Sequence, residues 1–317
     1  MDVAAVPPLL SDVDLWYLLA AILVFFLTRV LMAWKWQLLL HYAGFRQPFL
    51  YLLRIIFVSG FMGFFLPAGV GVDVIRTVEV GRRTGFAVSA ISTIADRIMA
   101  IITMILCSSI AALIALPAAP DLGHTLWTIV VLNLCIMAIV ALLLSKAALR
   151  TVHWIKGHWN PDSESHSRHH EGETISPSAR IFRIVAEKAM LVHADLRGLL
   201  GNHQVFVSAF LLNGLVQVAR ILLFAFLFLA CGAQVSFIYH IIFVPIIMIL
   251  TLLPVSFFGV GVREGACVFF YSQIGVDPAL ALTVSVWTYL VNLPVLAIGG
   301  IWFLVGPSKS SSESVVV

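Results

Sequence analysis

Five long hydrophobic segments constrain the fold of this chain more than any other feature. They span residues 16–34, 86–116, 126–144, 205–230 and 279–305. Each is close to or above the roughly 20 apolar residues that a helix needs to cross a bilayer. Because lipid cannot satisfy an exposed backbone, such segments must be helical. The sequence therefore predicts an all-α polytopic membrane protein with one integral membrane domain over residues 1–317.

From the composition we expect no additional soluble domain. Of the 317 residues, 61% are hydrophobic and only 11% are charged, and the mean hydropathy is +1.03, whereas a water-soluble surface must be largely polar. The only extended polar stretch, residues 145–202, is too short for a catalytic domain. The net charge of +3 does not suggest a nucleic-acid surface. The four cysteines lie in apolar segments without CxxC spacing, so we expect neither a disulfide framework nor a zinc site. We also expect no other metal and no cofactor.

Lys and Arg indicate how the segments are oriented. Lys35 and Arg46 follow the first segment, three Arg precede residue 86, and loop 145–202 holds eight Lys or Arg. Since such residues remain on the cytoplasmic side, these loops should be cytoplasmic. Segments 49–67 and 237–254 then cannot cross fully. We expect about five full spans and two re-entrant hairpins of opposite orientation.

Two similar glycine-rich breaks follow these shorter segments. In each, an Arg lies nine residues after a Pro, and the glycines alternate with valine. The residues of the breaks are Pro67, Gly69 and Gly71, then Pro254, Gly259 and Gly261. Paired interruptions of this kind are typical of inverted repeats, here about 16–116 and 205–306, with a transport site between them. The alternative is that the glycines only allow close helix packing.

Charged and polar side chains within the apolar segments are the candidate substrate-binding residues, since a charge at membrane depth is retained where it pairs or faces water. They are Arg54, Asp73, Arg76, Glu79, Asp96, Arg97, Asn213, Gln217, Arg220, Arg263 and Glu264. Spacings of three and four also place Ser89, Thr93 and Asp96 on one helix face, and Ser285, Thr288 and Asn292 on another. The alternative is that these stripes only hold the helices together.

The chemistry of the two breaks leaves the ligand open. Arg76 and Arg263, beside glycine N–H groups, suit a phosphate, because guanidinium binds oxyanions through two hydrogen bonds. Glu79 and Glu264 would instead suit a cationic headgroup or the uptake of protons.

At these residues the chain resembles the transmembrane region of lysylphosphatidylglycerol synthases and its stand-alone, flippase-like relatives. The resemblance rests on LPAGVGVDVIR at 66–76, ADR at 95–97 and FGVGVREG at 258–265. It implies movement of a lipid between leaflets in a bacterial inner membrane. No aminoacyl-transferring domain accompanies these motifs, so synthase activity is not implied.

The function expected from these observations is a lipid flippase for a polar, anionic headgroup. Two alternatives remain open. One is a membrane transferase that uses Asp73, Asp96 or Glu264 as a base, and the other is a non-catalytic partner of a lipid-modifying enzyme. The histidines at 158–170 indicate a linker rather than a metal site, and residues 178–200 predict a basic amphipathic helix on the inner leaflet.

Overall fold

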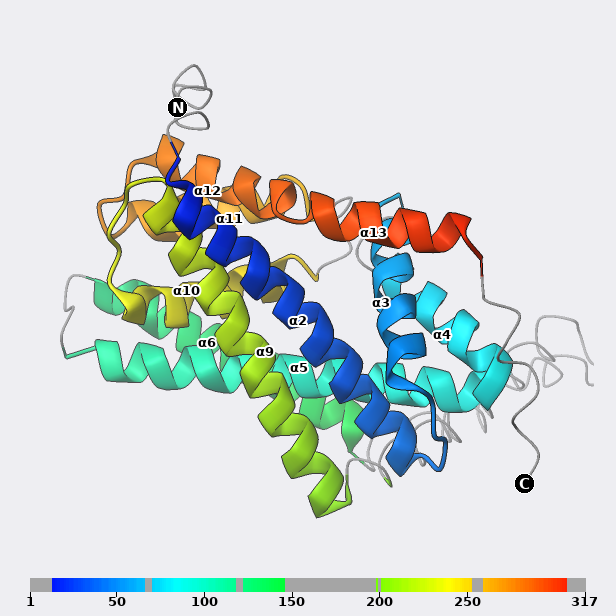
Figure 1. Cartoon of the computed structure of the whole chain (residues 1–317). Coiled ribbons are helices and arrows are strands. Elements are labelled where there is room, and N and C mark those ends of the chain that lie inside the picture. Colours follow the sequence, from blue (N-terminus) through cyan, green and yellow to red (C-terminus); the bar gives the residue numbers. More distant parts are fainter. Residues whose placement is uncertain are drawn as a thin grey trace, which may run out of the picture.

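The computed structural model describes residues 13–65, 70–117, 122–145, 198, 201–252 and 259–306, which form helices and their connections (Figure 1). Five helical stretches are long and apolar enough to cross a membrane. The all-helical class and the five spans are thus confirmed, whereas the re-entrant geometry and the inverted repeat remain predictions. Pro67, Gly69, Pro254 and most of loop 145–202 lie outside the described residues.

Two long helices, α2 (Leu15–Tyr42) and α9 (His203–Ala230), pack side by side (Figure 1). Both begin at a side-chain cap: Asp14 accepts from the Trp16 amide at 2.8 Å, and Asn202 accepts from the Gln204 amide at 3.0 Å. Such caps satisfy N–H groups that the first helical turn leaves unpaired.

Helix α2 is longer than its apolar segment predicts. The expected end at residue 34 is wrong, because the helix continues to Tyr42. At 1.5 Å per residue its 28 residues extend about 42 Å. Lys35 therefore lies inside the helix, 3% exposed, and not in the following loop.

The two shorter segments form helix pairs. α3 (Phe49–Phe64) packs on α4 (Val70–Thr84), and α10 (Phe237–Leu250) packs on α11 (Val262–Ser272). The glycines of the two breaks differ in conformation. Gly71 lies within α4, whereas Gly259 and Gly261 adopt φ of 80° and 87° just before α11, a region that L-residues with a side chain rarely enter.

The remaining spans are α5 (Phe86–Ala115), α6 (Gly123–Leu144) and a pair formed by α12 (Pro278–Leu290) and α13 (Leu293–Leu304). The last segment was expected to be one helix, but it is interrupted at residues 291 and 292. Pro294 stands in the first turn of α13. Because proline has no N–H and clashes with the preceding turn, it interrupts the helix there.

The apolar core consists of two main clusters. The larger lies among α2, α5, α6 and α9–α12, and the smaller lies among α2, α3 and α4. Large apolar side chains on the outer faces of α2, α5 and α6 are exposed, including Leu23, Ile110 and Leu134. In an integral membrane protein this exposed surface meets lipid, which is as apolar as the side chains themselves.

Candidate binding site

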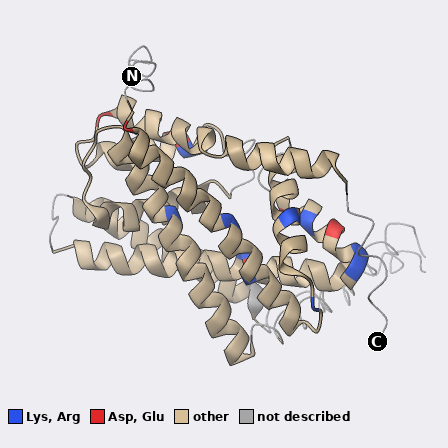
Figure 2. Cartoon of the chain, viewed as in Figure 1, with Lys and Arg blue, Asp and Glu red and all other residues tan. Residues whose placement is uncertain are grey.

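A cavity of about 250 Å³ lies where the two core clusters meet, lined by residues of α2, α4, α5 and α9–α11, by Thr288 of α12 and by Asn292 just before α13. Its charged lining consists of Arg29, Lys35, Asp73, Arg76, Asp96, Arg97, Arg220 and Arg263. Six cations and two carboxylates give a formal net charge of +4. Figure 2 shows charged residues in this central part of the bundle and at the end formed by α3 and α4. α6 contains no charged residue.

One part of the lining, the paired side, consists of Lys35, Arg76, Arg97, Asp73 and Asp96. Asp96 binds Lys35 Nζ at 2.7 Å and Arg76 Nη2 at 3.0 Å. Asp73 binds Arg76 Nε at 3.1 Å and also Arg97 Nε. The contacts form a chain of alternating charges that connects α2, α4 and α5. Only one positive charge of the five residues is left over.

The Lys35 and Arg76 side chains of this network are deeply buried. Both are 3% exposed, and the Asp96 side chain is 6% exposed. Lys35 also donates to Asn213 Oδ1 at 2.8 Å, and the Arg76 guanidinium lies over the Trp36 ring at 5.1 Å. Charges removed from the surrounding solvent to this extent are stable only when they are paired and hydrogen-bonded.

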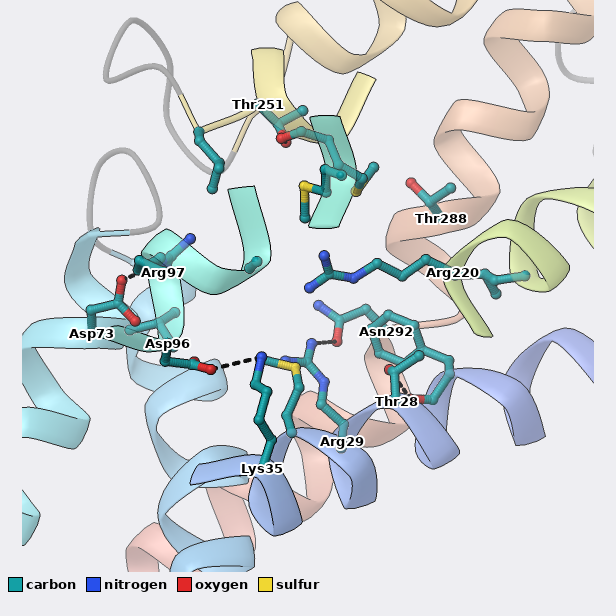
Figure 3. Close-up of a pocket in the computed structure, with 18 of the residues that line it drawn as sticks. Thr28, Arg29, Lys35, Asp73, Asp96, Arg97, Arg220, Thr251, Thr288 and Asn292 are labelled. Carbon is teal, nitrogen blue, oxygen red and sulfur yellow. Dashed lines mark hydrogen bonds and ion pairs between the residues drawn. The ribbon is translucent and has the colours of Figure 1, made fainter. Parts of the chain in front are cut away.

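The other part, the arginine side, consists of Arg29, Arg220 and Arg263. Arg29 donates to Asn292 Oδ1 at 3.3 Å, and Arg263 donates to Thr288 Oγ1 at 2.8 Å. Among the described residues, no carboxylate lies within 4 Å of any of the three guanidinium groups. Figure 3 shows Arg29 and Arg220 pointing into the cavity from α2 and α9.

Two irregular stretches of backbone position the residues of the arginine side: the interruption between α12 and α13 and the glycine-rich turn before α11. Asn292 lies at the interruption between α12 and α13, and Thr288 lies one turn earlier. Arg263 is the second residue of α11, directly after the turn that contains Gly259 and Gly261. The Arg263 guanidinium also lies 4.5 Å from the centroid of the Tyr289 ring. Neutral groups therefore orient two of the three arginines without compensating their charge.

Six of the eleven predicted substrate-binding residues line the cavity: Asp73, Arg76, Asp96, Arg97, Arg220 and Arg263. Asn213 contacts this group through Lys35. Gln217 is buried at 2% exposure but is not part of the lining.

The other three predicted residues lie elsewhere. Arg54 donates to the carbonyl of Trp302 at 2.7 Å and to that of Gly306, and so connects α3 to the end of α13. Glu79 pairs with Arg82 at the surface, at 3.2 Å. Glu264 accepts from the Gly261 amide at 2.6 Å and caps α11.

Sequence reasoning missed two cations of the lining, Arg29 and Lys35. The signal for Arg29 was present, because it interrupts the apolar segment 16–34 and a charge inside such a segment is a site candidate. Lys35 follows the segment directly and resembles a loop charge. Its partner Asp96 is 61 positions away in the sequence, so only the tertiary fold brings the two together.

The part of the chain that the structure describes contains no group of three His, Cys, Asp or Glu that is arranged to hold a metal ion. The histidines at 158–170 lie outside that part.

Comparison with known proteins gives one match. The family model described as the lysylphosphatidylglycerol synthase TM region matches residues 1–300. No curated protein and no solved structure matches the chain. The match covers all of the helices that form the cavity and nearly all of the chain, so this integral membrane protein belongs to the family of the lysylphosphatidylglycerol synthase transmembrane region.

Proposed function

We propose that this protein moves a lipid with an anionic, phosphate-bearing headgroup between the two leaflets of the membrane. Its family indicates a lipid-related function in the membrane. The observation that carries the more specific proposal is the cavity charge of +4 among apolar helices. Each Arg or Lys at the centre of a membrane helix costs about 2.5–3.5 kcal/mol on insertion scales. A lining with several uncompensated cations therefore favours an anionic ligand.

The size of the cavity supports passage of a headgroup alone. A volume of about 250 Å³ lies below the usual range for drug-sized ligands. The acyl or prenyl tails would remain in lipid while the headgroup occupies the cavity. The two helix pairs, α3 with α4 and α10 with α11, would rock about this site as inverted re-entrant hairpins, with their glycine-rich breaks as hinges.

The placement of the acidic candidates argues against a cationic headgroup. Glu79 and Glu264 lie outside the cavity lining, and Asp73 and Asp96 already bind cations of the protein. A positively charged aminoacyl group would therefore face an excess of positive charge. We propose that the chain resides in a bacterial inner membrane with loop 145–202 on the cytoplasmic side, and that a lipid-modifying enzyme supplies its substrate.

Reconstitution tests this function. Purified protein in liposomes would be assayed with tail-labelled phosphatidylglycerol, polyprenyl phosphate and lysylphosphatidylglycerol, and movement between leaflets would be measured by quenching from outside. We expect anionic lipids to move and the cationic lipid to remain, and Arg220→Gln to lower the rate at least about tenfold. The matched control is Arg46→Gln, which removes an exposed Arg that is not part of the lining.

Two results would contradict the proposal. Movement of lysylphosphatidylglycerol alone would require a cationic ligand, and no movement of any lipid would remove the flippase function. Mass spectrometry of the same liposomes would detect a chemically altered lipid, which would favour the transferase alternative.

A further inference from the structure

The arginine side brings together three cations from three separate helices. Arg29 belongs to α2, Arg220 to α9 and Arg263 to α11. All three line one cavity and have no carboxylate within 4 Å in the described part of the chain. Like charges brought together in this way repel one another, so the arrangement favours a ligand that compensates them.

The groups around these arginines fix their positions but leave hydrogen-bonding capacity unused. The Arg29 guanidinium lies 4.8 Å from the centroid of the Phe25 ring, and Arg263 is held by Thr288 and Tyr289. The Nε atoms of Arg29 and Arg263 are buried and have no hydrogen-bond partner among the described residues. A buried donor without a partner costs about 1–3 kcal/mol, which a bound oxyanion would recover.

Arg76 Nε on the paired side also has no hydrogen-bond partner among the described residues, but it lies 3.1 Å from the Asp73 carboxylate, so the two sides differ in charge balance. The two carboxylates of the paired side hold its three cations and leave one formal charge, whereas the arginine side carries three. An anionic group entering the cavity is therefore attracted most strongly to Arg29, Arg220 and Arg263.

Charge and shape together specify the kind of phosphate. A phosphodiester, as in most phospholipids, carries one negative charge and two terminal oxygens. A phosphate monoester carries about −1.5 to −2 at neutral pH and three terminal oxygens. Three guanidinium groups, each able to donate two parallel hydrogen bonds, match three oxygens and leave less positive charge uncompensated.

We infer that the arginine side is a site for a terminal phosphate, that of a phosphate monoester or diphosphate, and that it discriminates against phosphodiesters. The inference rests on the proposed function, because it names the class of lipid that would be moved: a lipid that ends in a free phosphate.

Two small ligands, one a phosphate monoester and the other a phosphodiester, test the site directly. Methyl phosphate and dimethyl phosphate would be titrated into the detergent-solubilised full chain, with binding measured by calorimetry and by the rise in unfolding temperature. Wild-type protein and Arg46→Gln should bind methyl phosphate at least about tenfold more tightly than dimethyl phosphate. Arg220→Gln should lose most of this preference while unfolding at the same temperature as wild type without ligand. Equal affinities in the wild type would overturn the inference.

Transport in liposomes separates this inference from the proposed function. Faster movement of polyprenyl phosphate than of phosphatidylglycerol supports both. Arg220-dependent movement of phosphatidylglycerol in preference to polyprenyl phosphate would overturn the monoester site and leave the flippase intact. Selective binding of methyl phosphate without movement of either lipid would retain the site and reject the flippase. Uptake of labelled inorganic phosphate into the same vesicles would identify free phosphate, and not a lipid, as the ligand.

Discussion

The two sides of the cavity contain the same number of cations and differ in their partners. Lys35, Arg76 and Arg97 on the paired side share two aspartates, whereas Arg29, Arg220 and Arg263 have no carboxylate in contact within the described residues. Cations with protein partners contribute to the structure, and cations without them are available to a ligand. The number of intramembrane charges therefore does not identify a site until their partners are known.

The same difference separates the two similar breaks. Asp73 lies three residues before Arg76 and binds it, but the residue three positions before Arg263 is Val260. Both arginines lie nine residues after a proline. This difference, together with the contact of Arg76 with Asp96 at 3.0 Å, places Arg76 on the paired side, whereas Arg263 belongs to the arginine side.

The largest expected effect follows from removing a carboxylate of the paired side. Asp96→Asn leaves Lys35 and Arg76 without their shared counter-ion, which should cost about 3–5 kcal/mol in the free energy of unfolding. Unfolding in detergent, followed by circular dichroism, measures this loss. Combining the change with Lys35→Met should recover part of the stability, because a buried pair replaced on both sides costs little. If the double variant were as unstable as Asp96→Asn alone, the loss of stability would not come from the unpaired Lys35.

The corresponding change on the arginine side should affect binding and spare stability. Arg220→Gln and Arg29→Gln each remove a charge without a carboxylate partner, so the free energy of unfolding without ligand should stay the same or rise. Affinity for a phosphate monoester should fall by about 1.5–3 kcal/mol, the usual value for a charged hydrogen bond. Unfolding and calorimetry on the same samples separate the two quantities. A large loss of stability would mean that these arginines have structural partners after all.

A third change would give the arginine side a carboxylate partner like those of the paired side. Asn292→Asp places a carboxylate at the Arg29 guanidinium, where Asn292 Oδ1 now lies 3.3 Å from Nη2. The new ion pair should weaken monoester binding by about 1.5 kcal/mol, because it compensates Arg29 and repels the ligand. Stability without ligand should increase. Calorimetry with methyl phosphate measures the first effect, and unchanged affinity would exclude Arg29 from the site.

The smallest expected effect concerns orientation. Thr288→Val removes the hydroxyl that accepts from Arg263 at 2.8 Å and keeps the shape of the side chain. We expect affinity for methyl phosphate to fall by about 1 kcal/mol, the net value of one hydrogen bond. Thr283→Val is the matched control, because this buried hydroxyl bonds only to the carbonyl of Ala279 in its own helix. An equal effect of both changes would argue against a role of Thr288 in the site.

The sequence predicted the class of fold and most of the helices, because hydrophobic length is a local property. Four of the candidate binding residues that line the cavity are Arg76 and Arg263 of the two breaks and Asp96 and Arg220 within apolar segments; their role in binding stays a prediction. Which cations have partners could not be predicted, since the contact of Lys35 with Asp96 depends on the packing of α2 on α5. The interruption after α12 was missed, although Pro294 indicates it.

The interruption at Asn292 has a mechanical consequence. α13 is fastened to α3, where Gly299 allows the two backbones to approach so closely that an added Cβ would lie 2.3 Å from the Phe57 carbonyl oxygen. α12 instead packs on α11, which carries Arg263. The two helices that meet at Asn292 thus pack on opposite ends of the molecule, and Asn292 itself accepts a hydrogen bond from Arg29. A movement of α3 relative to α11 would change the angle between α12 and α13 at Asn292 and would shift Arg29 relative to Arg263. The affinity for a bound phosphate would therefore depend on this interhelical angle.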